Sequence, residues 1–129
     1  MDNQLNRVIL CLGSNLDKEK NMERAAERLR ALFVSIRFAE PIYTDAFDCP
    51  VPTTFLNQVA IAFSPQTANE ITERLKEIER SLGRRPEDKG LGRVPIDIDL
   101  LCWNGEVLKP DDLRRDYIQA GIHSLLPSS

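Results

Sequence analysis

The chain has 129 residues and a net charge of −3, with 42% apolar and 29% charged residues, a composition typical of a soluble globular domain. This length predicts a single domain, 1–129, whose core needs no disulfides. The acidic balance without a basic arm argues against nucleic-acid binding, and no apolar run approaches the length of a membrane span.

The cysteines and the start of the chain predict a reduced, cytoplasmic setting. Met1–Gln4 does not resemble a secretory signal peptide. Cys11, Cys49 and Cys102 are odd in number and lack CxxC spacing, so they predict neither a disulfide framework nor a zinc site. Because Cys11 and Cys102 lie in apolar runs, we expect them to pack as small hydrophobic residues.

The first half of the chain predicts three strands and one helix. Val8–Leu12 is a short apolar run typical of a buried strand, and it ends at the turn cluster that begins with Gly13. Asp17 is expected to cap a helix whose apolar residues recur at helical spacing. Val34–Tyr43 and Phe55–Phe63 are predicted as the next two strands, with a proline-bracketed loop over residues 44–54 between them.

A second helix begins with a capping-box signature. Thr67 is followed three residues later by Glu70, and an apolar stripe then runs from Ile71 to Leu82 before Gly83 ends the helix. A polar loop, 84–93, leads into the next strand.

The last part of the chain predicts a strand, a hairpin and a short helix. Ile96–Trp103 is the strand, and Asn104-Gly105 is a strong signal for a two-residue hairpin turn. A short helical stretch follows near Leu113–Ala120. The order β-α-β-β-α-β plus a hairpin predicts an α+β, ferredoxin-like fold, with two helices on one face of an antiparallel sheet.

Two carboxylates alternate with branched apolar residues in Asp97-Ile98-Asp99. On a strand, Asp97 and Asp99 project from one face, about 6–7 Å apart at the backbone, while Ile98 points to the other. Two carboxylates at this spacing repel each other unless a cation or a proton lies between them. The pair therefore indicates a divalent-metal site, Mg²⁺ with phosphate being a common case, or else two acids that simply face solvent.

Four segments in order resemble the 6-hydroxymethyl-7,8-dihydropterin pyrophosphokinase family of folate biosynthesis. They are Leu12–Leu16, then Tyr43 followed by Phe55-Leu56-Asn57, then Ile78-Glu79 with Gly83-Arg84, and last the arginine-rich loop that leads into Asp97–Leu101. Each segment alone is weak, but together they cover most of the chain with nearly the family spacing.

The resemblance implies transfer of pyrophosphate from ATP to the hydroxymethyl group of a reduced pterin, with release of AMP. It assigns Asp97 and Asp99 to two Mg²⁺ ions bound with ATP. The partners would be ATP and the pterin, and the chain would be a monomer or a homodimer. Two other hypotheses remain: a catalytically impaired relative that still binds a pterin or nucleotide, and a ferredoxin-like interaction domain without a small ligand.

The predicted pterin site centres on an amide and an aromatic ring. The Asn57 amide would pair with the pterin edge, or else bond to nearby backbone. Phe55 would stack on the ring, or else pack in the core. The resemblance also places Asp45 at a family threonine position, beside Thr44. The remaining expected substrate-site residues form the turn after the first strand: Gly13, Ser14 and Asn15.

The predicted nucleotide site carries charged residues. Arg84 would approach the transferring group, because a guanidinium matches phosphate geometry; its alternative is a solvated charge after a helix end. Glu79 maps to a nucleotide-site position, or is an ion-pair partner of Arg84. Arg93 is a second phosphate candidate, although it lies one residue upstream of the family arginine.

The chain departs from the family pattern at several other positions. Leu91 stands where an aromatic residue is common. Near the C-terminus, the usual basic residues and the second pterin-stacking aromatic have no evident counterpart, and Arg114 and Arg115 are candidates to replace the lost charge. His123, the only histidine, is expected at the surface.

Overall fold

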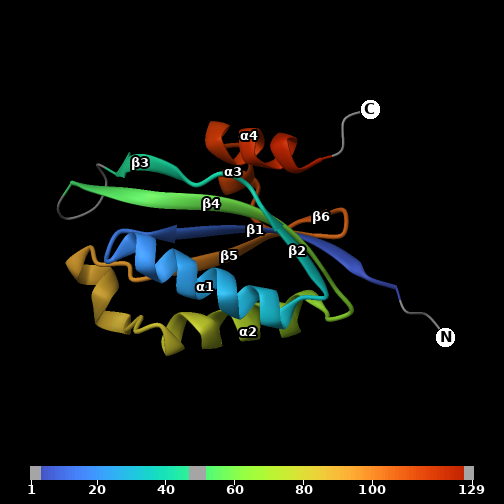
Figure 1. Cartoon of the computed structure of the whole chain (residues 1–129), viewed down its shortest axis with the longest axis horizontal. Helices are drawn as coiled ribbons and strands as arrows, with labels where there is room; N and C mark the ends of the chain where they lie inside the picture. The colour runs from blue at the N-terminus through green and yellow to red at the C-terminus, as the bar shows by residue number, and fades with distance from the viewer. Residues whose placement is uncertain (1–3, 47–51, 127–129) are drawn as a thin grey trace.

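The computed structural model describes residues 4–46 and 52–126. Figure 1 shows a sheet with helices on both faces. None of the helices in the described part of the chain is both long and apolar enough to cross a bilayer. The elements, in chain order, are β1 (Asn6–Ser14), α1 (Lys18–Leu32), β2 (Ser35–Phe38), β3 (Ile42–Ala46), β4 (Thr53–Ser64), α2 (Ala68–Ser81), a 3₁₀ helix (Pro86–Leu91), β5 (Asp97–Trp103), β6 (Glu106–Val107), α3 (Pro110–Leu113) and α4 (Asp116–Leu125).

The strands form the predicted antiparallel sheet. Its order is β2-β4-β1-β5-β6, with β3 also paired to β4. β1 pairs antiparallel with both β4 and β5, so it lies between the strand that precedes α2 and the strand that follows it. This is the split β-α-β arrangement of a ferredoxin-like fold, and it confirms the predicted α+β class. The predicted hairpin is also present, because β5 pairs with β6 across Asn104-Gly105.

The expected single strand Val34–Tyr43 is wrong in one respect, because the structure has two strands there. β2 pairs with the C-terminal half of β4, and β3 pairs with its N-terminal half. Pro41 lies between them, and proline has no N–H to donate to a strand ladder. Of the loop predicted over residues 44–54, the first three residues belong to β3 and the last two to β4; Cys49 and Pro50 lie outside the described residues.

The capping prediction holds for one helix and fails for the other. Thr67 Oγ1 accepts a hydrogen bond from the Glu70 N–H at 3.2 Å, and Glu70 Oε1 accepts from the Thr67 N–H at 2.9 Å, which completes the capping box of α2. Asp17 precedes α1 as expected, but its backbone is left-handed (φ 45°) and its side chain makes no capping hydrogen bond.

Helices cover both faces of the sheet, whereas the sequence predicted helices on one face only. α1 and α2 pack over a core that includes Val8, Leu10 and Leu100. α4 packs on the opposite face, over a smaller core that includes Ile9, Val59 and Leu101 (Figure 1). The predicted helix Leu113–Ala120 is thus two helices, and the second runs to Leu125 because it has this sheet face to bury against.

A glycine sets how closely α4 approaches the sheet. A Cβ atom added at Gly121 would lie 2.7 Å from Val59 Cγ2, well inside van der Waals contact. Glycine therefore lets the helix lie against β4, and this contact fixes the height of α4 above the strands.

Candidate functional site

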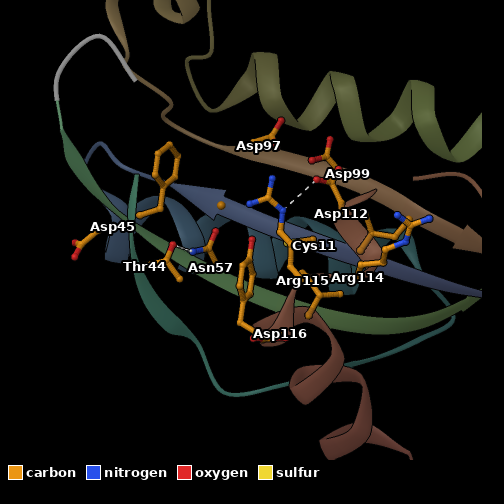
Figure 2. A pocket seen from close by; sticks show the side chains of 15 residues that line it. Cys11, Thr44, Asp45, Asn57, Asp97, Asp99, Asp112, Arg114, Arg115 and Asp116 are labelled. Atoms are coloured by element: carbon orange, nitrogen blue, oxygen red, sulfur yellow. Dashed lines mark hydrogen bonds and ion pairs between the residues drawn. The ribbon is translucent and has the colours of Figure 1, made fainter. Parts of the chain in front are cut away.

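A cavity of about 760 Å³ lies on the sheet face opposite α1 and α2. Strands β1, β3, β4 and β5 form its floor and one wall, and α3 and α4 form the other wall. Figure 2 shows side chains from all these segments directed toward one space. The cavity collects residues that lie more than 100 positions apart in the chain, from Cys11 to Ile118.

Strand register places three predicted site residues in one row. Gly13 on β1 is directly opposite Asn57 on β4 and Asp97 on β5. The buried Asn57 donates from Nδ2 to Thr44 Oγ1 at 2.6 Å, a bond drawn in Figure 2. A Cβ atom at Gly13 would lie 3.2 Å from Asn57 Oδ1, so the glycine leaves room beside that oxygen.

Asp97 and Asp99 share the cavity face, and Ile98 and Leu100 are buried in the core on the other face. This is the alternation predicted from the sequence. Burial, together with the neighbouring Asp97 carboxylate, raises the pKa of Asp99 to about 8. Burial, and then the charges of these two aspartates, raises the pKa of the adjacent Cys11 to about 12. Cys11 is thus an un-ionised thiol in the cavity floor, whereas Cys102 is buried as expected.

The carboxylate pair fits a hard divalent cation. Two carboxylates held this close in a partly buried site are stabilised by a cation between or beside them. Among residues 4–46 and 52–126, no cluster of three or more acidic, histidine or cysteine side chains is arranged as a metal site. Two protein carboxylates, with water and phosphate oxygens completing the shell, is a coordination pattern that Mg²⁺ commonly adopts.

Arg84 and Glu79 form an ion pair that is hydrogen-bonded to the outer edge of β5. Arg84 Nη1 donates to Asp97 Oδ1 at 2.7 Å, to Glu79 Oε2 at 3.0 Å and to the Ile96 carbonyl at 3.3 Å. Glu79 Oε2 also accepts from the Ile98 N–H at 2.7 Å, and burial raises the pKa of Glu79. The end of α2 is thereby fastened to the strand that carries both aspartates.

Two aromatic side chains line the same cavity from different elements. Phe55 projects from β4 and Tyr117 from the first turn of α4. Burial raises the pKa of Tyr117 to about 12, so its hydroxyl is neutral. Aromatic rings on two sides of a cavity suit a flat heterocycle.

The family model described as 7,8-dihydro-6-hydroxymethylpterin-pyrophosphokinase (HPPK) matches residues 9–127. The chain belongs to the HPPK family. It is 28% identical over 137 residues to "Folic acid synthesis protein FOL1" of Dictyostelium discoideum, covering 95% of this chain and 20% of that protein. It is 30% identical over 136 residues to the 2-amino-4-hydroxy-6-hydroxymethyldihydropteridine pyrophosphokinase of Porphyromonas gingivalis, covering 93% of this chain and 90% of that enzyme. The chain is therefore a member of an enzyme family.

Tyr117 is a second aromatic residue in the cavity of this HPPK-family chain, and its stacking on a pterin ring is a prediction. The sequence offered no evident counterpart of a second stacking aromatic, yet Tyr117 lies in the cavity with Phe55. The apolar residues Ile118, Ile122 and Leu125 on α4 pack toward the sheet, and this helical spacing was the signal that α4 lies on the site face.

Two residues at the turn after β1, Ser14 and Asn15, form hydrogen bonds to the segment before β5 but do not line the cavity. Ser14 Oγ donates to the Pro95 carbonyl at 2.6 Å. Asn15 Nδ2 donates to the Gly92 carbonyl at 2.7 Å, and Asn15 Oδ1 accepts from the Val94 N–H at 2.6 Å. Direct substrate contact by these two side chains remains a prediction, and their observed contacts hold the entry to β5.

The other predicted site residues are placed differently. Asp45 lines the cavity and accepts a hydrogen bond from Thr54 Oγ1 at 3.1 Å; Figure 2 shows it on the far side of Asn57 from the two aspartates. Arg93 is outside the cavity lining, is 54% exposed, and lies 3.7 Å from Asp88.

Basic residues from the C-terminal segment do reach the cavity. Arg114 and Arg115 both line it, and Arg115 Nε lies 3.4 Å from Asp112 Oδ1, an ion pair visible in Figure 2. His123 is exposed on α4, as expected for a surface residue. Positive charge therefore enters the cavity from α3–α4, where the sequence motif of the family is least evident.

Proposed function

We propose that the chain transfers the pyrophosphoryl group of ATP to the hydroxymethyl oxygen of 6-hydroxymethyl-7,8-dihydropterin. The observation that carries this proposal is the convergence of Asn57, the Phe55 and Tyr117 rings, and the Asp97–Asp99 pair on one cavity. A flat ring with amide-like edges and a charged polyphosphate are the two chemistries that such a cavity suits.

The pterin would lie at the Asn57 end of the cavity. One Nδ2 hydrogen of Asn57 is engaged by Thr44, so the Oδ1 acceptor and the second Nδ2 hydrogen would pair with the pterin edge. Phe55 and Tyr117 supply ring faces for stacking, and Gly13 leaves space beside Asn57.

The triphosphate would lie at the aspartate end. Asp97 and Asp99 would hold Mg²⁺, two ions being expected with ATP, and bound Mg²⁺ offsets the negative charge of phosphate oxygens during transfer. Arg115 lines the cavity and would supply N–H donors from α3–α4. Arg84 lies outside the cavity lining with its Nη1 bonded to Asp97, so its donors to phosphate would be its other guanidinium nitrogens. The pterin hydroxyl would lose its proton to water and form a bond to the β-phosphorus. The bond from that phosphorus to the oxygen that bridges the α- and β-phosphates would break, and AMP would leave with that oxygen.

The test is AMP production from ATP and the hydroxymethyl pterin with Mg²⁺. Wild-type chain should release AMP in step with pterin diphosphate, and Asp97→Asn should lower kcat about a thousandfold, since metal-held charge contributes several kcal/mol to such transition states. The matched control is Asp111→Asn, because Asp111 has a 96% exposed side chain outside the cavity lining. Absence of AMP from folded wild-type chain with Mg²⁺ or Mn²⁺ would refute the proposal.

One observation favours a second candidate, a relative that binds ligand with impaired turnover. Arg93, the predicted second phosphate contact, is half-exposed and lies beside Asp88 outside the cavity. Calorimetry separates the two hypotheses: an impaired relative binds the pterin or ATP but forms no AMP, whereas the enzyme does both.

A further inference from the structure

Arg84 Nη1 has more acceptors than it can satisfy. A terminal guanidinium nitrogen carries two hydrogens, yet Asp97 Oδ1, Glu79 Oε2 and the Ile96 carbonyl all lie within 3.3 Å of it. Removing any one acceptor still leaves a partner for each hydrogen. Arg84 can therefore release Asp97 without leaving a donor unpaired.

Glu79 is the partner that stays in place. Its side chain is only 13% exposed, and its Oε2 atom is fastened by the Ile98 N–H at 2.7 Å, between the two aspartates in sequence. A buried carboxylate needs a positive partner, and Arg84 Nη1 lies 3.0 Å away. Asp97, by contrast, is 36% exposed and lines the cavity.

We propose that Glu79 is a positioning residue that retains Arg84 at the edge of β5 while Asp97 exchanges the arginine for a divalent cation. The inference rests on the proposed function for the identity of the cation site. It adds that Arg84 neutralises Asp97 until the cation binds and that Glu79 then retains Arg84. In the ligand-free chain Arg84 neutralises Asp97; with the cation bound, Glu79 and the Ile96 carbonyl hold both Nη1 hydrogens.

The test measures binding of Mn²⁺ alone, by the loss of its free-ion electron paramagnetic resonance signal, without ATP or pterin. Arg84→Gln removes the competing cation and should raise Mn²⁺ affinity about fivefold, as expected for an ion pair whose side chains are 31% and 36% exposed. Glu79→Gln keeps an acceptor for the Ile98 N–H but weakens the hold on Arg84. It should therefore leave Arg84 with Asp97 and lower Mn²⁺ affinity about fivefold.

The double variant separates positioning from simple charge. If Glu79 acts through Arg84, Glu79→Gln has no effect on Mn²⁺ affinity once Arg84→Gln is present. If Glu79 only adds negative charge near the site, it lowers affinity equally in both backgrounds. Matched controls on the same helix are Glu77→Gln and Arg80→Gln, which change the same charges at exposed positions and should shift affinity less than about twofold.

Every outcome decides the inference. Mn²⁺ affinity that is unchanged or lower in Arg84→Gln, or equal effects of Glu79→Gln in both backgrounds, overturns it. If Glu79→Gln does not fold, the Mn²⁺ affinities of Arg84→Gln and Arg80→Gln are compared. A larger gain in affinity for Arg84→Gln supports the exchange of Arg84 for the cation at Asp97, and an equal gain in the two variants overturns it. Wild-type chain that binds Mn²⁺ but makes no AMP would remove the proposed function and leave this inference standing, whereas no Mn²⁺ binding would remove both.

Discussion

The two faces of the sheet come from the same strands but have different chemistry. Leu10 and Cys11 are neighbours on β1; the first is fully buried under α1 and α2, and the second lies in the cavity floor beside Asp99. On the α1–α2 face the core is continuous and apolar. On the α4 face, a small core at one end gives way to the cavity at the other.

This difference indicates that one face of the sheet contributes mainly to stability, whereas the other carries the polar side chains of the cavity. The larger apolar core lies on the α1–α2 face, and its burial stabilises the fold while the other face holds two acidic side chains close together. The aspartate pair is costly for stability in the absence of a cation, and the opposite face tolerates this cost. Sites that bind phosphate and metal commonly carry such local destabilisation.

Leu10→Ala tests this division with the largest expected effect. Truncating a fully buried leucine should lower the free energy of unfolding by about 3 kcal/mol. Cys11→Ala, one residue along the same strand, should lower it by less than about 1 kcal/mol, because the thiol borders a cavity. Urea denaturation measures both variants; equal losses would contradict the comparison.

Gly121→Ala should push α4 away from the sheet. It should lower the free energy of unfolding by about 2 kcal/mol, because the added methyl group overpacks the interface. The added methyl group would overlap Val59, so the double variant with Val59→Ala should recover part of the loss. Gly105→Ala is the matched control, since a Cβ atom there meets nothing within 4 Å. Thermal unfolding distinguishes the three; if Gly121→Ala unfolds like Gly105→Ala, α4 is not closely packed on β4.

Tyr117→Ala tests whether α4 contributes to ligand binding in addition to packing. Loss of the ring should raise KM for the pterin about tenfold at saturating ATP, because one stacking face is removed. Tyr117→Phe keeps the ring and should leave KM nearly unchanged. A pterin KM that does not respond to Tyr117→Ala would assign this residue to the α4 core alone.

Asp99→Asn has the smallest expected effect on the free energy of unfolding, and the variant should be more stable than wild type. The folded chain raises the pKa of Asp99 from 3.8 to about 8, so between these values the folded state holds more protons than the unfolded state and loses stability as pH rises. Without metal, the variant should match wild type below about pH 4 and exceed its stability by about 1 kcal/mol above pH 8, less than the pKa shift alone implies because the buried Asn amide is itself removed from water. Denaturation with a chelator at several pH values measures this; a less stable variant at pH 9 would show that Asp99 is not under repulsion.

Much of the fold followed from local patterns in the chain. The apolar run of β1, the capping box at Thr67 and the Asn104-Gly105 turn each depend on neighbouring residues, so their elements were predictable. The break between β2 and β3 was missed although Pro41 signals it. The extent of α4 was missed because its length depends on the sheet face that it covers.

The sequence alone determined the fold class, the shared face of Asp97 and Asp99, and the family resemblance, because these depend on strand alternation and on motif order. Tertiary structure decided which groups meet. It brought Tyr117 opposite the strand residues of the cavity, kept Arg93 outside it, and joined Glu79 to the backbone between the aspartates. The physical reason is that these contacts join residues from separate elements, and only packing of α2 and α4 on opposite faces of one sheet sets their distances.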